Sequence, residues 1–203
     1  MASSTSSSSA PASAITSLSE LRIGGQPATD QQVSFACNNV GNQIFNGGFE
    51  LVDYDGDALG WSFTTDDTAV MFFVDAEDAT QHTPNGNRDG QVVSDSDTAS
   101  GRLYQSLTLC PNTTYSFEAW TRQQNFLTEC IATFQINMTA IGTVMPGTSW
   151  TNAMSDPMNY TVGPGEQDGA VDLSVFVICS GEGISDADRV IELDDISLVQ
   201  LMS

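Results

Sequence analysis

The chain has 203 residues and carries 26 acidic against five basic side chains, which gives a formal net charge of −21 at pH 7. A charge of this sign repels phosphate backbones and anionic membrane surfaces, so nucleic acids and lipid bilayers are excluded as partners. With 40% hydrophobic residues, the chain is too apolar for general disorder, and it is long enough for one sizeable core.

The N-terminal segment differs in composition from the rest. Residues 1–14 are mainly serine, alanine and threonine, which predicts a disordered tail or linker. They lack the apolar stretch of a signal peptide, so we interpret Met1 as an added start on a mature or excised domain. No apolar run predicts a transmembrane helix. Residues 15–41 fit either a short helix or an irregular strand, and we expect this extension to pack on, or extend, a domain formed by residues 42–203.

Beyond residue 41, short β-branched and aromatic runs are separated by Gly, Pro, Asn and Asp, without a helical period. Three runs alternate strictly between two faces. Their expected core-facing sets are Tyr115, Phe117 and Ala119; Cys130, Ala132, Phe134 and Ile136; and Val171, Leu173, Val175, Val177 and Cys179. A further apolar run starts at Val190. This pattern predicts an all-β fold, an antiparallel β-sandwich with jelly-roll topology.

Four cysteines, without a CxxC pair and with a single histidine, favour two disulfides over a metal cluster. Sequence alone permits three pairings. Cys130 opens one core-facing set and Cys179 closes another, so on antiparallel neighbours they lie at the same end of a sheet. We therefore predict Cys130–Cys179, which leaves Cys37–Cys110. Three glycosylation sequons agree with a secreted protein, extracellular or attached to a cell wall, and begin at Asn112, Asn137 and Asn159.

Two sequence features suggest an EF-hand and a catalytic triad, but the residues around them argue against both. The acidic stretch Asp53–Asp57 resembles a calcium loop of the EF-hand type, but the position six residues after Gly56 is Ser62 instead of glutamate, so a solvated turn is expected. His82 lies in a turn-like stretch without a nucleophile motif, which argues against a catalytic triad. A hydrolase that uses two carboxylates stays an alternative, because a chain with 26 acids contains some pair at a suitable distance. Such a pair is therefore no evidence for catalysis. We expect a protein without enzymatic activity.

An ordered set of motifs resembles one known family. The motifs are "FNGGFE" (45–50), "GW" (60–61), "DG" (89–90), "LYQSLTLCPNTTYSFEAWTR" (103–122), "SW" (149–150) and "IELDDISL" (191–198). In this order they resemble the carbohydrate-binding modules of the cellulase-C type, which belong to the galactose-binding-like β-sandwiches. The resemblance extends from Ile44 to Leu201. It departs at Asn112, where the family usually has glycine, and the residues before Cys37 have no counterpart.

The resemblance implies a structural calcium ion where the "NGGFE" turn meets the terminal "LDD". Calcium takes about six to eight oxygen ligands from carboxylates and main-chain carbonyls, and a divalent cation compensates acids that would be costly to bury unpaired. The expected ligands are the Gly48 carbonyl and the carboxylates of Glu50, Asp89, Asp194 and Asp195. The alternative is that Glu50 caps backbone amides and the aspartates face water.

Glycan binding by such sandwiches uses aromatic rings against the C–H faces of sugars, with polar groups that fix the hydroxyls. Trp120 lies between Glu118 and Arg122 on the outward side of its predicted strand. Thr133 and Gln135 lie on the corresponding side of theirs, and we expect them to extend the same groove. The alternative is an outer face covered by a loop, with Trp120 as a filler. Trp61 and Trp150 are predicted to anchor the core or its loops.

Three classes of function compete. The first, which we expect, is a non-catalytic carbohydrate-binding module that recognises a cell-wall polysaccharide. The second is a secreted structural or adhesive protein that self-associates when its N-terminal segment adds a strand to a neighbouring copy. The third is a hydrolase.

Overall fold

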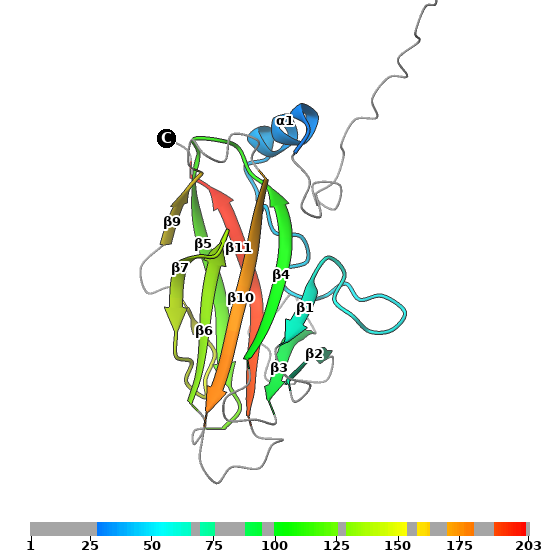
Figure 1. Cartoon of the computed structure of the whole chain (residues 1–203), viewed down its shortest axis with the longest axis vertical. Coiled ribbons are helices and arrows are strands. Elements are labelled where there is room, and N and C mark those ends of the chain that lie inside the picture. Colours follow the sequence, from blue (N-terminus) through cyan, green and yellow to red (C-terminus); the bar gives the residue numbers. More distant parts are fainter. Residues whose placement is uncertain are drawn as a thin grey trace, which may run out of the picture.

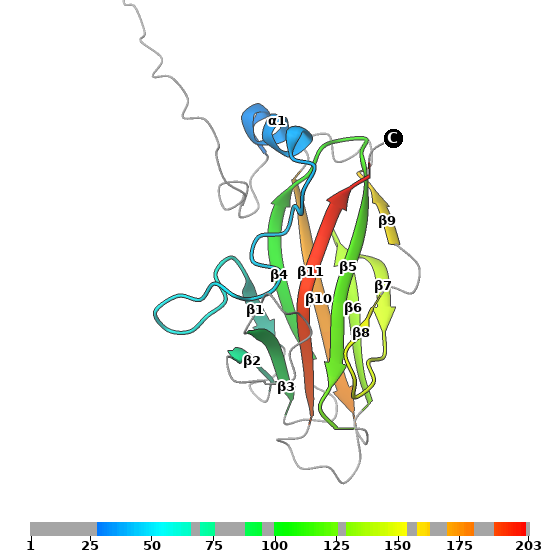
Figure 2. The ribbon, with the colours of Figure 1, turned by 180° about the vertical axis from the view of Figure 1, so that it is seen from behind.

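Two antiparallel β-sheets pack face to face, and one helix lies at one end of the sandwich (Figures 1 and 2). The computed structural model describes residues 28–65, 70–75, 88–94, 100–125, 129–153, 158–162, 170–180 and 189–201. The first sheet, the β10 sheet, has the order β1 (Ser62–Thr65), β4 (Ser100–Thr108), β10 (Ala170–Ser180), β6 (Glu129–Ile136), β7 (Thr139–Val144). The second, the β11 sheet, has the order β2 (Val70–Asp75), β3 (Asp89–Ser94), β11 (Val190–Gln200), β5 (Thr114–Gln123), β8 (Thr151–Asn152), with β9 (Met158–Thr161) also paired to β5. The prediction of an all-β antiparallel sandwich is confirmed.

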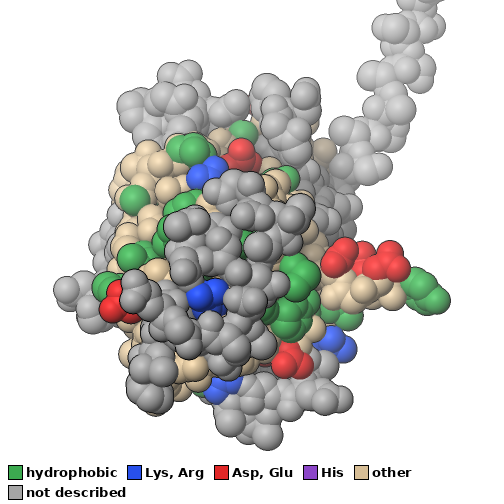
Figure 3. All heavy atoms as spheres, turned by 60° about the horizontal axis from the view of Figure 1, so that its bottom comes forward, with side chains coloured by type: hydrophobic (Ala, Val, Ile, Leu, Met, Phe, Trp, Pro, Cys, Tyr) green, Lys and Arg blue, Asp and Glu red, His purple; other side chains and the backbone are tan. Residues whose placement is uncertain are grey.

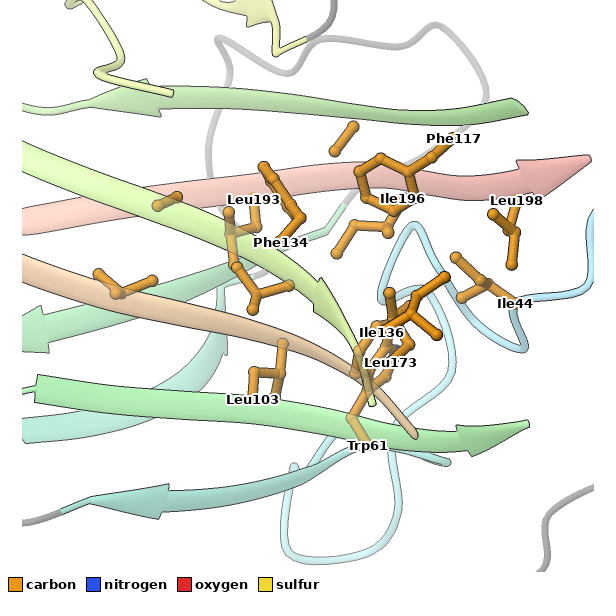
Figure 4. Close-up of a cluster of buried hydrophobic side chains, with 14 of the residues drawn as sticks. Ile44, Trp61, Leu103, Phe117, Phe134, Ile136, Leu173, Leu193, Ile196 and Leu198 are labelled. Atoms are coloured by element: carbon orange, nitrogen blue, oxygen red, sulfur yellow. The ribbon is translucent and has the colours of Figure 1, made fainter. Parts of the chain in front are cut away.

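The hydrophobic core lies between the two sheets and is built from the alternating positions of their strands (Figure 4). Every member of the three core-facing sets expected from the sequence is buried. The rings of Phe117 on β5 and Phe134 on β6 meet across the interface, with their centroids 5.0 Å apart. The period of two in the sequence therefore records which side of each strand faces the opposite sheet.

Both predicted disulfides are present. Cys130 and Cys179 are directly opposed residues on neighbouring strands β6 and β10. Cys37, at the end of the helix α1 (Asp30–Asn38), is bonded to Cys110, just after β4. Each crosslink closes a long loop and stabilises the native state by about 4 kcal/mol in the chain-entropy model.

The described part of the N-terminal extension is helical. Thr29 and Gln32 form a capping box, in which each side chain satisfies the other residue's backbone amide. The choice between helix and strand is thus settled for Asp30–Asn38, while residues 1–27, including the predicted tail, lie outside the described residues. Self-association through this segment stays a prediction. None of the described helices is long and apolar enough to cross a membrane.

Candidate functional site

The first turn of the sandwich docks onto a bulge in the last strand. Asn46 and Phe49 take left-handed conformations, with φ of 55° and 57°, and reverse the chain at Gly47 and Gly48. The Ile196 amide donates a hydrogen bond of 3.0 Å to the Gly47 carbonyl. A Cβ on Gly47 would lie 1.9 Å from the Ile196 carbonyl oxygen, so only glycine permits this approach. Early and late segments of the chain therefore meet here.

The bulge in β11 directs two neighbouring carboxylates toward this turn. The register of β11 against β5 shifts between Asp194 and Ser197, and Asp195 has a left-handed φ of 46°. Asp194 is only 3% exposed, and its Oδ1 accepts a hydrogen bond of 2.7 Å from the Asp195 amide. The Oδ1 atoms of Asp194 and Asp195 lie 3.5 and 3.4 Å from the position that a Cβ on Gly48 would take.

Two more acids complete this acidic cluster, which comprises Glu50, Asp89, Asp194 and Asp195. Asp89 is 1% exposed, and its Oδ1 accepts no hydrogen bond from the part of the chain that the structure describes. Burial raises its pKa to about 6, and the charge of Asp75 acts in the same direction. Burial raises the pKa of Asp194 to about 7, and the charges of Asp195, Asp89 and Glu50 add to this rise. Burial and the neighbouring acids thus favour the protonated forms of Asp89 and Asp194.

The donor set of the acidic cluster fits a hard cation. Carboxylates and the main-chain oxygen of Gly48 are the ligands that calcium takes, and the unpartnered Asp89 oxygen is of this kind. Among the described residues, no three His, Cys, Asp or Glu side chains lie close enough together to hold a metal ion by themselves. A cation here would therefore need main-chain oxygens in addition to carboxylates. Glu50 Oε1 also accepts a hydrogen bond of 3.1 Å from the Arg88 amide, so its expected alternative role as a cap is present too.

Trp120 and Glu118 line a pocket next to the acidic cluster. Its volume is about 260 Å³, and the other lining residues are Asn42, Gly48, Asp195, Ile196 and Ser197. Trp120 is half-buried, whereas Glu118 is exposed. The pocket offers one aromatic ring together with carboxylate, amide and hydroxyl groups, which is the mixture expected for sugar contacts.

Arg122, the third residue predicted for this region, is held by other partners. Its Nε donates to Oε2 of Glu192, a carboxylate that is 0% exposed. Gln124 Nε2 donates to the other oxygen of Glu192 over 2.7 Å. The Arg122 guanidinium carbon lies 4.9 Å from the centroid of the Trp150 ring, which gives that tryptophan its expected anchoring role. Arg122 is not among the residues that line the Trp120 pocket.

The expectation that Thr133 and Gln135 extend the Trp120 groove is wrong. Trp120 lies on β5 of the β11 sheet, whereas Thr133 and Gln135 lie on β6 of the β10 sheet. Because each set faces away from the core, the two sets lie on opposite outer faces of the sandwich. The sequence-predicted residues therefore belong to two separate surfaces.

A second, open surface lies on the outer face of the β10 sheet. Cross-strand pairing arranges its side chains in two adjacent rows, Tyr104–Ser174–Gln135 and Arg102–Phe176–Thr133. A groove of about 240 Å³ opens here, and its lining residues are Thr64, Arg102, Tyr104, Asn137, Met138, Asp172 and Ser174. We call it the β10-face groove.

Polar contacts tie together the two rows of side chains, part of which line the β10-face groove. The Arg102 guanidinium carbon lies 5.9 Å from the centroid of the Phe176 ring. Arg102 Nη2 and Ser174 Oγ each donate to Gln135 Oε1 over 3.4 Å. On the edge of the groove, Ser106 Oγ donates to Asp172 Oδ1 over 2.6 Å. This face thus combines the aromatic ring of Phe176 with hydrogen-bond donors and acceptors that are held in place by their neighbours.

Sequence reasoning missed Tyr104, Arg102 and Phe176, although a signal was present. In "GRLYQSLTL", Leu103 and Leu107 alternate with Arg102, Tyr104 and Ser106, so an aromatic and a basic residue stand on the outward side of a buried strand. Outward aromatic side chains on a half-buried strand are candidates for ligand contacts.

The remaining predicted residues are placed as follows. Trp61 is buried, and its Nε1 donates to the Asn46 carbonyl over 2.9 Å, as expected of a core anchor. The acidic turn Asp53–Asp57 is exposed and projects from the sandwich (Figure 3). His82 lies outside the described residues. Two of the sequon residues, Asn112 and Asn137, are exposed in turns, and the third, Asn159, lies on β9.

Comparisons with known proteins support the fold. No family model and no curated protein matches the sequence. Among solved structures, TmCBM61 in complex with β-1,4-galactotriose matches with a TM-score of 0.55 and 19% identity, over 79% of this chain and 99% of that one. A Stig cyclase from Fischerella sp. TAU, in complex with an indole compound, gives a TM-score of 0.56 and 15% identity, over 81% of this chain and 98% of that one.

A third likeness is to the enzymatically active domain of tailspike protein 4 from bacteriophage CBA120. Its TM-score is 0.55 and its identity 14%, over 79% of this chain. The matched region spans only 21% of the tailspike chain. A carbohydrate-binding module, a cyclase and part of a tailspike protein thus share this sandwich, so the residues on its surface have to carry the argument about function.

Proposed function

We propose that this protein is a non-catalytic glycan-binding module and that the β10-face groove is its binding surface. The observation that carries this proposal is the pair of cross-strand rows, which places Tyr104 and Phe176 among Arg102, Gln135 and Thr133. Aromatic rings stack on the apolar faces of sugar rings, while the guanidinium, amide and hydroxyl groups bind their hydroxyls. The fold is shared with TmCBM61, whose structure contains β-1,4-galactotriose, and this likeness supports the same class of ligand.

The ligand is a neutral polysaccharide. A net charge of −21 repels polymers of acidic sugars over distances up to the Debye length, about 8 Å at physiological ionic strength. A neutral glycan is not subject to this repulsion. A cell-wall polysaccharide with exposed neutral chains meets the requirement, and the two disulfides suit an extracellular setting.

The groove binds without catalysis. Hydrolysis of a glycosidic bond needs two carboxyl groups about 5 to 10 Å apart on either side of the bond. Among the described residues that line the groove, only Asp172 carries a carboxylate, and it accepts a hydrogen bond from Ser106. The Trp120 pocket is a second candidate sugar contact, since Glu118 and Asn42 stand beside its aromatic ring.

The acidic cluster holds a structural calcium ion in this proposal. Its ligands would be the Gly48 carbonyl, further main-chain oxygens and carboxylates drawn from Glu50, Asp89, Asp194 and Asp195, of which no three described ones lie close enough together to share the ion. Calcium would favour the ionised forms of Asp89 and Asp194, whose pKa values are raised by burial and by neighbouring acids. In this way the ion would fasten the first turn of the sandwich to its last strand.

Affinity electrophoresis of the unglycosylated protein against glucans, xylans, galactans, chitin and mannans tests the proposed function. We expect at least one neutral glycan to retard the protein, and Tyr104→Ala to abolish the retardation. Tyr54→Ala is the matched control, because Tyr54 is fully exposed on the acidic turn. Trp120→Ala reports separately on the second pocket. The proposal fails if no glycan retards the protein, or if Tyr104→Ala migrates like the wild type.

A further inference from the structure

The turn between β6 and β7 forms one end of the β10-face groove. Asn137 and Met138 both have left-handed conformations, with φ of 49° and 66°. The Asn137 amide donates to the Asp172 carbonyl, and the Asp172 amide donates to Asn137 Oδ1, each over 2.9 Å. These two bonds fix the asparagine over the neighbouring strand β10.

The same turn reaches beyond β10 to the third strand of the sheet. Arg102 Nη1, on β4, lies 3.0 Å from the sulfur of Met138. Both turn residues line the groove together with Tyr104 and Ser174. A group attached to Asn137 would therefore start at the lining of the groove.

Asn137 is also the first residue of the sequon Asn137–Met138–Thr139, and it is exposed. Oligosaccharide added to such an asparagine in the secretory pathway is bulky and hydrophilic. Because the addition occurs on the nascent chain, the later hydrogen bonds of Asn137 to Asp172 do not prevent it. They do determine where the sugar begins once the protein has folded.

We propose that an N-linked glycan on Asn137 occupies the end of the β10-face groove and blocks the binding of external glycans. This inference rests on the proposed function, because it assigns a regulator to the same groove. The secreted, modified protein would be closed to its ligand, and removal of the Asn137 glycan by a glycosidase would open it. The Asn112 sequon offers a contrast, since this exposed residue lies in the turn between β4 and β5 and does not line the groove.

The test uses the full chain secreted from a eukaryotic host, with the occupancy of each sequon measured by mass spectrometry. Thr139→Ala removes the Asn137 sequon but keeps the asparagine and its bonds to Asp172. Asn112→Gly is the matched control, because glycine accepts the left-handed φ of 57° at that position. We expect Thr139→Ala to bind the retarding glycan at least about tenfold more tightly than the wild type, and Asn112→Gly to bind like the wild type.

A second measurement does not depend on any external ligand. Hydroxyl-radical footprinting compares the oxidation of Tyr104 in the glycosylated wild type and in Thr139→Ala, with the remote Tyr54 as an internal standard. We expect Tyr104 to be oxidised several-fold more slowly in the wild type.

The outcomes separate the two proposals. An unoccupied Asn137 in the secreted protein, or equal oxidation of Tyr104 in both forms, overturns the inference about the glycan. Equal glycan binding by both forms overturns its blocking role and leaves the proposed function standing. If Tyr104 is protected but no form binds any external glycan, the proposed function fails while the placement of the Asn137 sugar holds.

Discussion

The Ile196 amide donates a 3.0 Å hydrogen bond to the Gly47 carbonyl and thereby joins the first turn of the sandwich to its last strand. We predict that Gly47→Ala destabilises the protein by about 2 to 4 kcal/mol, because the new methyl group would overlap the Ile196 carbonyl oxygen. Urea unfolding measures this change. Gly147→Ala is the control, since nothing lies within 4 Å of its added Cβ, and equal stability of the two variants would contradict the close approach.

The stability of the metal-free protein should fall as the pH rises from about 4 to about 7. Asp89 and Asp194 have folded-state pKa values of about 6 and 7, whereas the unfolded chain releases these protons near 3.8. Between these values the native state binds more protons than the unfolded state, so raising the pH favours unfolding. The unfolding midpoint, measured with a chelator present, reports the slope.

Two variants separate this effect from the general charge of the chain. Asp194→Asn should make the slope shallower, while Asp55→Asn, on the exposed acidic turn, should leave it unchanged. A stability that rises over the same range in the wild type would contradict the burial of these two acids.

Calcium should raise the melting temperature, and a chelator should reverse the rise. A ligand that binds only the native state stabilises it by about 2.7 kcal/mol at a concentration one hundred times its dissociation constant. The response should grow from about pH 5 to about pH 7, because the carboxylates must lose their protons to bind the ion. Asp194→Asn should lose the response and Asp55→Asn should keep it; a wild-type melting temperature insensitive to calcium would remove the metal from the proposal.

Arg122→Ala should cost about 3 to 5 kcal/mol of stability, because it leaves the buried carboxylate of Glu192 without its cationic partner. Arg102→Ala, on the open groove, should change stability by less than about 1 kcal/mol and instead weaken glycan binding. Denaturant unfolding and affinity electrophoresis of both variants distinguish the two roles. The reverse result would place the ligand contact at Arg122, as the sequence pattern had suggested.

Alternation along single strands was enough to predict three core-facing sets, and the disulfide pairing followed from the added assumption that two of these strands are antiparallel neighbours. Cys130 begins one core-facing set and Cys179 closes another. The two strands pair in the register that puts these cysteines opposite each other. The helix was also within reach, since Thr29 and Gln32 carry the threonine-x-x-glutamine spacing of a capping box.

The grouping of outward residues could not be predicted in the same way. A period of two tells which side of a strand faces the core, but it does not tell to which of the two sheets the strand belongs. Trp120 and Gln135 therefore looked alike in the sequence, although strand order puts them on opposite faces. The fixation of Arg122 by Glu192 likewise depends on a pairing between β5 and β11 that no local pattern records.

The place of β11 in the middle of its sheet governs when the protein can fold. Its two neighbours, β3 and β5, precede it in the chain, and neither pairs with the other. Until residues 190–200 have left the ribosome, β3 and β5 each have one edge whose backbone groups lack their β11 partner. The β11 sheet cannot form before then. We expect these exposed edges to make the nascent chain prone to aggregation until β11 is added, and loss of this one strand to abolish the sandwich instead of shortening it.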